Sequence, residues 1–294
     1  MPELPLPETV TFVVVVAAYF AAAVVGVLQL RPGGEKYSRF LLPLVCLAVT
    51  LEAVILIFRA VAIKAVPLTG LFESMIVLTI VFGLTYLFLR IAIQQVWFSS
   101  VMVWVLLALV LLAAIVAKPA ALAHSAASTP WATAHAVAMI LAGAAAMLAM
   151  ASAVLYLFAR RKLKRKNLLE VLGKVPNIEK LERINIFGLK WCFVLMTFGL
   201  ASGIGLAAAT STSLNRTALD WLTDAKIVLI LVVWLLLGAI LAIWKTTRLK
   251  EKTIAHVTLV AFALILFAVV GTSIFCGTGH NFAGDDAQTA GQTR

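Results

Sequence analysis

Long apolar runs alternate with short polar segments along this chain. Each run is about twenty residues long, which is the length of an α-helix that crosses a bilayer and about twice that of the strands in a membrane β-barrel. The pattern therefore predicts an all-α fold, a polytopic membrane helix bundle with about eight transmembrane helices. The predicted spans are residues 10–30, 40–63, 72–90, 98–117, 131–159, 189–210, 225–244 and 254–276.

The composition agrees with this pattern. Of the 294 residues, 63% are hydrophobic and only 13% are charged, and the mean hydropathy is +1.06. Soluble domains have close to half apolar and a quarter charged residues. This composition excludes a water-soluble globule, and three cysteines without a CxxC pair exclude a disulfide scaffold.

The net charge of +11 reflects membrane topology. Of the 24 basic residues, 18 lie in the alternate linkers 31–39, 90–97, 160–190 and 245–252. By the positive-inside rule these linkers face the cytoplasm, so both termini face outward. This distribution argues against nucleic-acid binding. Residues 1–8 carry no Lys or Arg, so the first run is predicted to be a span and not a signal peptide.

The expected organisation is a single transmembrane domain over residues 1–284 with a flexible tail at 285–294. The basic cytoplasmic linker at 160–190 has leucines spaced for a short amphipathic helix, broken near Gly173 and Pro176. Two interpretations of this linker stay open: an anchor on anionic lipid or a docking surface for a partner.

Three of the four histidines are predicted at the outer face: His124, His135 and His280. His256 is predicted at the inner face. Trp131 lies one helical turn before His135 and shares its helix face. An interfacial histidine is often only a hydrogen-bonded boundary residue, but two imidazoles and flat aromatic surfaces are also what a haem site requires.

The segment before the seventh span carries further candidates. Trp221 precedes Asp224 and Lys226 in the predicted outer loop. Interfacial tryptophans are expected as belt anchors in any membrane protein. With the outer histidines, however, this loop could line an apolar platform for a planar ligand.

An acidic residue in the middle of the second span is unusual, because an ionised carboxylate inside a membrane is costly. Glu52 lies seven residues before Arg59, on the same helix face. The spacing allows a pairing bridged by water or another polar group, and it also allows a protonated Glu52. Structural and functional roles both stay open for the two residues.

Five short motifs, in order along the chain from about residue 12 to residue 282, together resemble the cytochrome c assembly protein family (CcsA, ResC and HemX). The motifs are VPLTGLFES at 66–74, WATAH at 131–135, LMTFGLASG at 195–203, WLTDAK at 221–226 and GHNF at 279–282. They resemble, in the same order, the family's "P-(L/V)-(T/S)-N-L-Y-E-S" entry to a helix, its "W-L-x-x-H", its "L-x-T-x-G-x-x-x-G", its "W-x-W-D-P-K-E" loop and its "L-H-S-Y".

The resemblance implies a membrane protein that holds haem at the outer face for cytochrome c maturation. His135 and His280 would be the axial ligands of the haem iron, and Trp131, Trp221, Asp224 and Lys226 would belong to the haem site. It also implies a bacterial-type cytoplasmic (inner) membrane, contact with membrane lipid, and as partners apocytochrome c and a further membrane assembly subunit. Any catalysis would be by positioning, because no nucleophile or nucleotide site is visible.

The chain departs from the family pattern at several places. The loop reads DAKI where the family has DPKE, and Glu52 and Ala242 stand where haem-exporting members have embedded histidines. These departures keep open a non-catalytic, HemX-like membrane regulator. A haem-binding electron-transfer or scaffold subunit of a larger membrane complex is also open.

Overall fold

The computed structural model describes residues 4–63, 67–68, 70–93, 95–116, 129–164, 177–214, 223–247 and 250–271. Over these residues the chain is helical, and eight of its helices are long and apolar enough to cross a membrane. The predicted fold class is confirmed. In chain order the helices are α1 Leu6–Leu28, α2 Leu41–Ile63, α3 Leu71–Ala92, α4 Val96–Val116, α5 Pro130–Lys164, α7 Ile178–Leu214, α9 Ala225–Thr247 and α10 Glu251–Leu266. A 3₁₀ turn, η1 (Gly34–Phe40), precedes α2, and a π-helical turn, η3 (Phe267–Gly271), follows α10.

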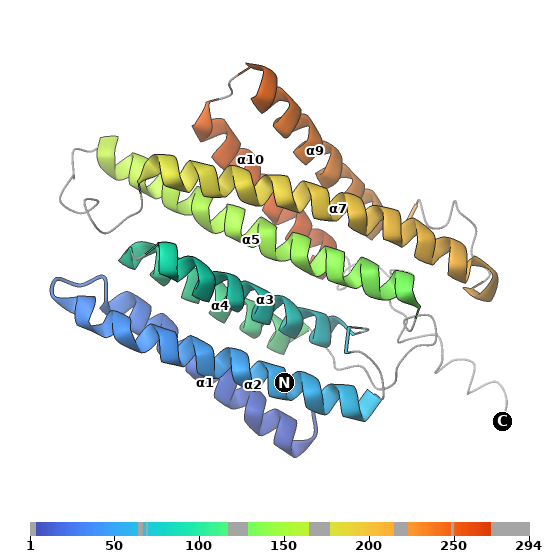
Figure 1. Cartoon of the computed structure of the whole chain (residues 1–294), viewed down its shortest axis with the longest axis horizontal. Coiled ribbons are helices and arrows are strands. Elements are labelled where there is room, and N and C mark those ends of the chain that lie inside the picture. The colour runs from blue at the N-terminus through green and yellow to red at the C-terminus, as the bar shows by residue number, and fades with distance from the viewer. Residues whose placement is uncertain are drawn as a thin grey trace.

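The eight helices form two groups that lie side by side (Figure 1). Helices α1 to α4 make the N-terminal half, and α5, α7, α9 and α10 make the C-terminal half. Each half has its own cluster of buried apolar side chains. Helix α5 belongs to both clusters: Met147, Leu148 and Leu155 pack into the first, and Ala142 and Ala146 into the second. Helix α5 therefore joins the two halves.

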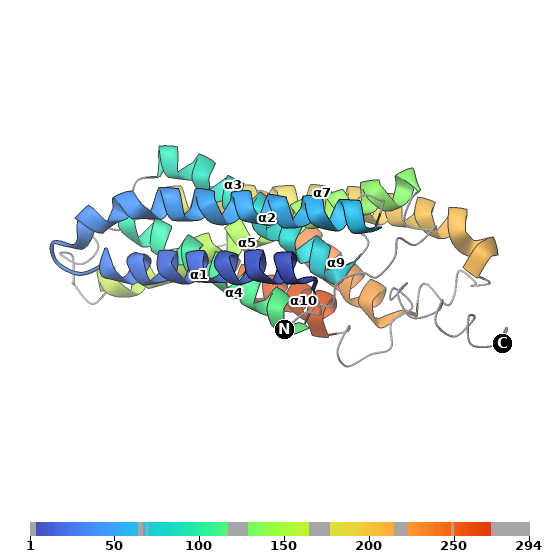
Figure 2. The same ribbon diagram turned by 90° about the horizontal axis from the view of Figure 1, so that it is seen from below.

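Helices α1 and α2 lie alongside each other and run in opposite directions (Figure 2). The chain turns between them at Gly33, whose φ of 74° is in the left-handed region that glycine adopts without strain. On α3, a Cβ atom at Gly83 would lie only 2.7 Å from a methyl group of Val49. Glycine at this position allows the close approach of α2 and α3 that buries the first core.

Helices α5 and α7 are longer than a bilayer requires, with 35 and 37 residues. At 1.5 Å per residue each is over about 50 Å long, compared with about 30 Å of hydrocarbon. Helix α5 continues to Lys164 and α7 starts at Ile178, so both helices extend into the region predicted as a basic linker. On α5 the Lys and Arg of the last turn favour this extension, since they are good helix formers and their charge suits a helix C-terminus. On α7 the acidic Glu179 in the first turn suits the N-terminus. Residues 165–176, with the expected break near Gly173 and Pro176, lie outside the described part of the chain.

The outer surface of the bundle carries many large apolar side chains. Ile115 is 81% exposed, Ile91 78%, Phe88 74% and Ile204 72%. Exposure of this extent is expected where the surrounding solvent is lipid. The protein is an integral membrane protein whose helices contact lipid.

Successive helices alternate in direction, so the ends of the bundle are well defined (Figure 1). One end gathers the start of α1, the end of α2 and the starts of α3, α5 and α9. The other end gathers the end of α5 and the start of α10, where the Tyr156 hydroxyl donates to Glu251 Oε2 over 3.2 Å. The charge rule predicts that the first end faces outward. The tail at 285–294 lies outside the described residues.

Candidate functional site

His135 lies on the first turns of α5, where the helix packs against the second half of α7. Its Nδ1 atom is 2.7 Å from the backbone oxygen of Gly199 on α7. Because a carbonyl oxygen can only accept, Nδ1 must carry the hydrogen, and Nε2 then presents its lone pair. This is the arrangement in which a histidine that binds a metal is usually held, with one ring nitrogen fixed by a backbone carbonyl and the other free to coordinate.

Glycines on α7 provide the surface against which this part of α5 packs. A Cβ atom at Gly203 would be 3.1 Å from His135 Nδ1, and one at Gly205 would be 2.7 Å from the Trp131 ring. At Gly199 it would be 2.6 Å from Met139 Sδ. Three side chains of one α5 face thus rest on three glycines. The motif at 195–203 therefore has a physical function: Gly203 leaves room for the histidine ring, and the backbone oxygen of Gly199 accepts its hydrogen bond.

Trp131 and His135 are brought together as the helical spacing predicted. Trp131 remains 51% exposed, with one part of its indole on Gly205. It thus offers an exposed aromatic surface one turn from the His135 imidazole. This placement suits an aromatic contact for a flat ligand, although the same placement also suits an interfacial anchor.

Asp224 and Lys226 lie at the start of α9, at the same end of the bundle. Asp224 caps the helix, since its Oδ1 atom accepts a hydrogen bond of 2.9 Å from the backbone nitrogen of Lys226. The Lys226 ammonium lies within electrostatic range of the His135 ring. Lys226 thus lies in the surroundings of His135, and Asp224 has a structural role as the cap of α9.

The remaining candidates divide into two groups. Trp221, His280 and His124 lie outside the described residues, so their placement stays a prediction. His256 is exposed at the start of α10, where its Nδ1 atom is 2.6 Å from the Lys252 backbone oxygen. Because the start of α10 meets the end of α5, His256 is at the opposite end of the bundle from His135.

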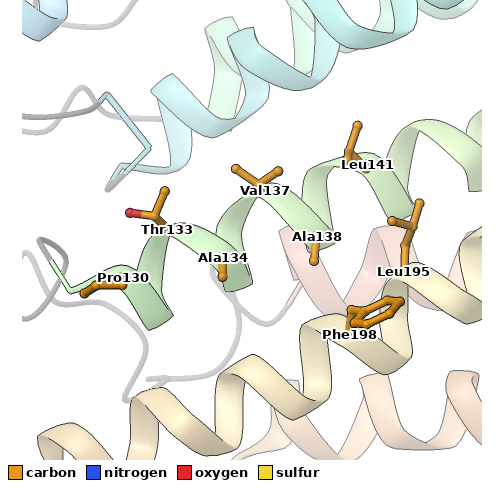
Figure 3. A pocket seen from close by; sticks show the side chains of 8 residues that line it. All are labelled: Pro130, Thr133, Ala134, Val137, Ala138, Leu141, Leu195 and Phe198. Carbon is orange, nitrogen blue, oxygen red and sulfur yellow. The ribbon is translucent and has the colours of Figure 1, made fainter.

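An apolar groove lies between the first half of α5 and the second half of α7. It is wide open, with a volume of about 740 Å³. Its lining comes from α5 (Pro130, Thr133, Ala134, Val137, Ala138 and Leu141) and from α7 (Leu195 and Phe198), as Figure 3 shows. Ala134 and Phe198 directly precede His135 and Gly199 in the chain, but successive residues of a helix point in different directions. The groove is therefore at the level of His135 on another face of α5, and His135 does not line it.

A second group of polar residues is buried in the N-terminal half. Arg59 Nε donates to Glu73 Oε1 over 2.8 Å, and its Nη1 atom is 3.7 Å from Glu8 Oε2. Arg59 and Glu52 form no direct ion pair in the described part of the chain. Glu52 instead accepts a hydrogen bond of 3.0 Å from the Tyr19 hydroxyl. Helical spacing correctly placed Glu52 and Arg59 on one buried face, but their partners come from α1 and α3.

The fold and this arrangement define a class: a polytopic α-helical membrane protein with a histidine held by a backbone carbonyl at one end of the bundle. The sequence profile of the family described as "Cytochrome C assembly protein" matches residues 68–277. The chain belongs to this family, which places it in cytochrome c maturation. No curated protein and no solved structure matches the chain.

Proposed function

We propose that this protein holds haem at the outer face of a bacterial-type cytoplasmic membrane during cytochrome c maturation, with His135 and His280 as the axial ligands. The observation that carries the proposal is the hydrogen bond from His135 Nδ1 to the Gly199 backbone oxygen. It fixes the ring and leaves Nε2 as the coordinating nitrogen, so the imidazole is suited to a haem iron before any ligand arrives.

The neighbourhood of His135 also fits a porphyrin. The groove between α5 and α7 is lined by apolar side chains apart from Thr133, and Trp131 offers an exposed ring one turn away. Lys226 supplies a positive charge at the same end of the bundle, which favours the carboxylates that haem carries. In this proposal Trp221 contributes a second aromatic surface, and Asp224 fixes the start of α9 beside the site.

Bound haem would supply the vinyl groups that react with the cysteine thiols of a client apocytochrome c. The residues of this chain orient the ring and exclude water, and the client provides the nucleophile. Catalysis by such a protein is by positioning, which can account for a large part of a barrier. We therefore propose apocytochrome c and a second membrane assembly subunit as its partners.

The test is an absorbance spectrum of the protein purified from haem-sufficient cells, recorded reduced minus oxidised. The wild type should show a Soret band with low-spin character. His135→Ala and His280→Ala should each remove one axial bond and reduce haem content or the low-spin signal. His256→Ala is the matched control, because this histidine lies at the other end of the bundle, and it should leave the spectrum unchanged.

Two results would contradict the proposal in different ways. If a double variant lacking His135 and His280 kept the wild-type spectrum, the ligand assignment would be wrong although haem is bound. If the wild type from the same cells contained no haem, the protein would act as the family's HemX-like members are expected to act, as a membrane regulator or scaffold.

A further inference from the structure

The N-terminal half contains a buried carboxyl group on elements other than those of the proposed haem site. Glu52, in the middle of α2, has no exposed surface, and neither has Tyr19 in the middle of α1. The Tyr19 hydroxyl donates to Glu52 Oε2 over 3.0 Å. The other carboxyl oxygen, Oε1, is fully buried and has no hydrogen-bond partner among the described residues.

The nearest cation on the same helix is not available to Glu52. Arg59 lies seven residues further along, about 10 Å by helical rise. Its guanidinium is occupied by Glu73 at 2.8 Å and by Glu8 at 3.7 Å. Among the described residues this cluster has two carboxylates to one guanidinium, so these residues offer no surplus positive charge to a third carboxylate.

The elements packed around Glu52 supply little else that could stabilise a charge. Helix α3 brings Gly83 close to this position, since a Cβ atom there would lie 3.7 Å from the Tyr19 hydroxyl and from Leu106 of α4. Further along α3, Tyr86 accepts a hydrogen bond from Arg90. Helix α4 has no titratable side chain. Among the described residues, Tyr19 is thus the titratable group that contacts Glu52.

A carboxylate with one hydrogen bond and no counter-charge is very costly in a bilayer interior. Addition of one proton at Oε1 removes the charge, turns the orphaned acceptor into a hydroxyl and leaves the Tyr19 bond on Oε2 intact. We propose that Glu52 and Tyr19 form a proton-binding site at the centre of the N-terminal half, separate from the haem site and independent of it.

Binding of the proton has a consequence for the packing of the helices. The α1–α2 contact at this level buries Glu52 in a neutral form, and loss of the proton places an uncompensated charge between the two helices. The contact between α1 and α2 is therefore most stable while Glu52 holds its proton. Its stability falls when the pH is raised far enough to remove that proton.

Infrared spectroscopy of the purified protein at neutral pH tests the proposal directly. The wild type should show the carbonyl stretch of a protonated carboxylic acid, and Glu52→Gln should lose that band. Glu52→Gln keeps an amide oxygen that can accept from Tyr19, so this variant is expected to fold. In Tyr19→Phe the band should remain but shift, because its carbonyl loses a hydrogen bond. Glu179→Gln is the control, since Glu179 is an exposed carboxylate in a surface pair and its replacement should not change the band.

A second measurement follows thermal unfolding as the pH is raised. The melting temperature of the wild type should fall at high pH, whereas that of Glu52→Gln should fall distinctly less. The proposal is wrong if Glu52→Gln leaves the acid band in place, or if wild type and Glu52→Gln show the same pH dependence. It is also wrong if sodium at constant pH stabilises the wild type but not Glu52→Gln, because the carboxylate would then bind a metal cation.

Discussion

Gly203 faces the His135 ring across the α5–α7 contact, and this contact depends on the absence of a side chain. In Gly203→Ala the new methyl carbon would lie 3.1 Å from Nδ1 and 3.2 Å from Cε1 of His135. The ring must move, and its bond to the Gly199 oxygen weakens. Because disturbed orientation of a ligand typically costs about 10-fold or more in metal affinity, haem content should fall by that order in spectra of the purified variant.

The matched control is Gly143→Ala on α5. There the added methyl would meet only the flexible end of Leu78, at 3.3 Å, so that side chain can yield. Haem content in this variant should equal that of the wild type. Equal haem content in Gly203→Ala and wild type would contradict the assignment of His135 as an iron ligand held in place by its bond to Gly199.

Arg59 permits a stability prediction at the scale of single residues. Arg59→Leu removes the guanidinium from two buried carboxylates, Glu73 and Glu8. Breaking a buried ion pair by removal of one partner costs about 3–5 kcal/mol. The expected result is a large drop in melting temperature and folding yield. It should be partly restored in the double variant Arg59→Leu/Glu73→Leu, in which one of the two partner carboxylates is removed with the guanidinium and Glu8 remains.

An exposed pair provides the comparison for that experiment. Arg183 and Glu179 form an i,i+4 ion pair on α7 with side chains 76% and 64% exposed. Surface pairs of this kind contribute little to stability, so Arg183→Leu should leave the melting temperature nearly unchanged. If Arg59→Leu and Arg183→Leu had the same small effect, the buried cluster would not contribute to stability.

At the scale of helices, the α5–α7 contact is the most extensive interface between described elements. A Cβ atom at Gly188 would lie 2.9 Å from the backbone oxygen of Ala145 and 3.0 Å from the backbone nitrogen of Ala149. Backbone atoms inside a helix cannot rotate away. Gly188→Ala should therefore push the helices apart and cost about 1–3 kcal/mol, as overpacking does, measured by thermal unfolding.

Gly238→Ala on α9 is the control for this variant. Its methyl would meet the Phe193 ring at 3.1 Å, which is a side chain that can adjust. The loss of stability should be clearly smaller than for Gly188→Ala. Equal losses would indicate that α5 and α7 can separate at no greater cost than a ring can turn.

The sequence was sufficient to predict the helices but not their partners. Eight spans follow from run length and composition, because the bilayer sets both. The lengths of α5 and α7 were not predicted, since their basic ends lack the apolar signal. Helical spacing reports which residues share a face of one helix, as it did for Glu52 and Arg59. It carries no information on what another helix brings to that face, here Tyr19 from α1 and Glu73 from α3.

The same limit applies to the candidate site. His135 was predicted from its motif and its position at a helix start. The Gly199 carbonyl was not predicted, because every residue has a backbone carbonyl and the sequence does not mark which one accepts a hydrogen bond. The available signal was the glycine spacing at 199 and 203 in the same motif. Small residues in a membrane helix indicate close packing, and only the arrangement in space shows which side chain they accommodate.

For the whole molecule, the charge distribution predicts that the His135 end of the bundle faces outward. Single cysteines can test this in a variant without the native cysteines. An impermeant thiol reagent on intact cells should label Thr223→Cys, near the start of α9, and should fail to label Arg183→Cys, in the first turns of α7. The reverse labelling would invert the orientation and place the proposed haem site at the cytoplasmic face.

The membership of α5 in both cores has a consequence for how the protein is made. Side chains of α5, together with Leu181 of α7 and Ala255 of α10, complete the buried cluster of the first four helices. During synthesis, α1 to α4 are made before any of these residues. The N-terminal half must therefore wait in the bilayer with one face uncovered, and a chain that stops after α4 would offer that face to lipid, to a chaperone or to the membrane's proteases.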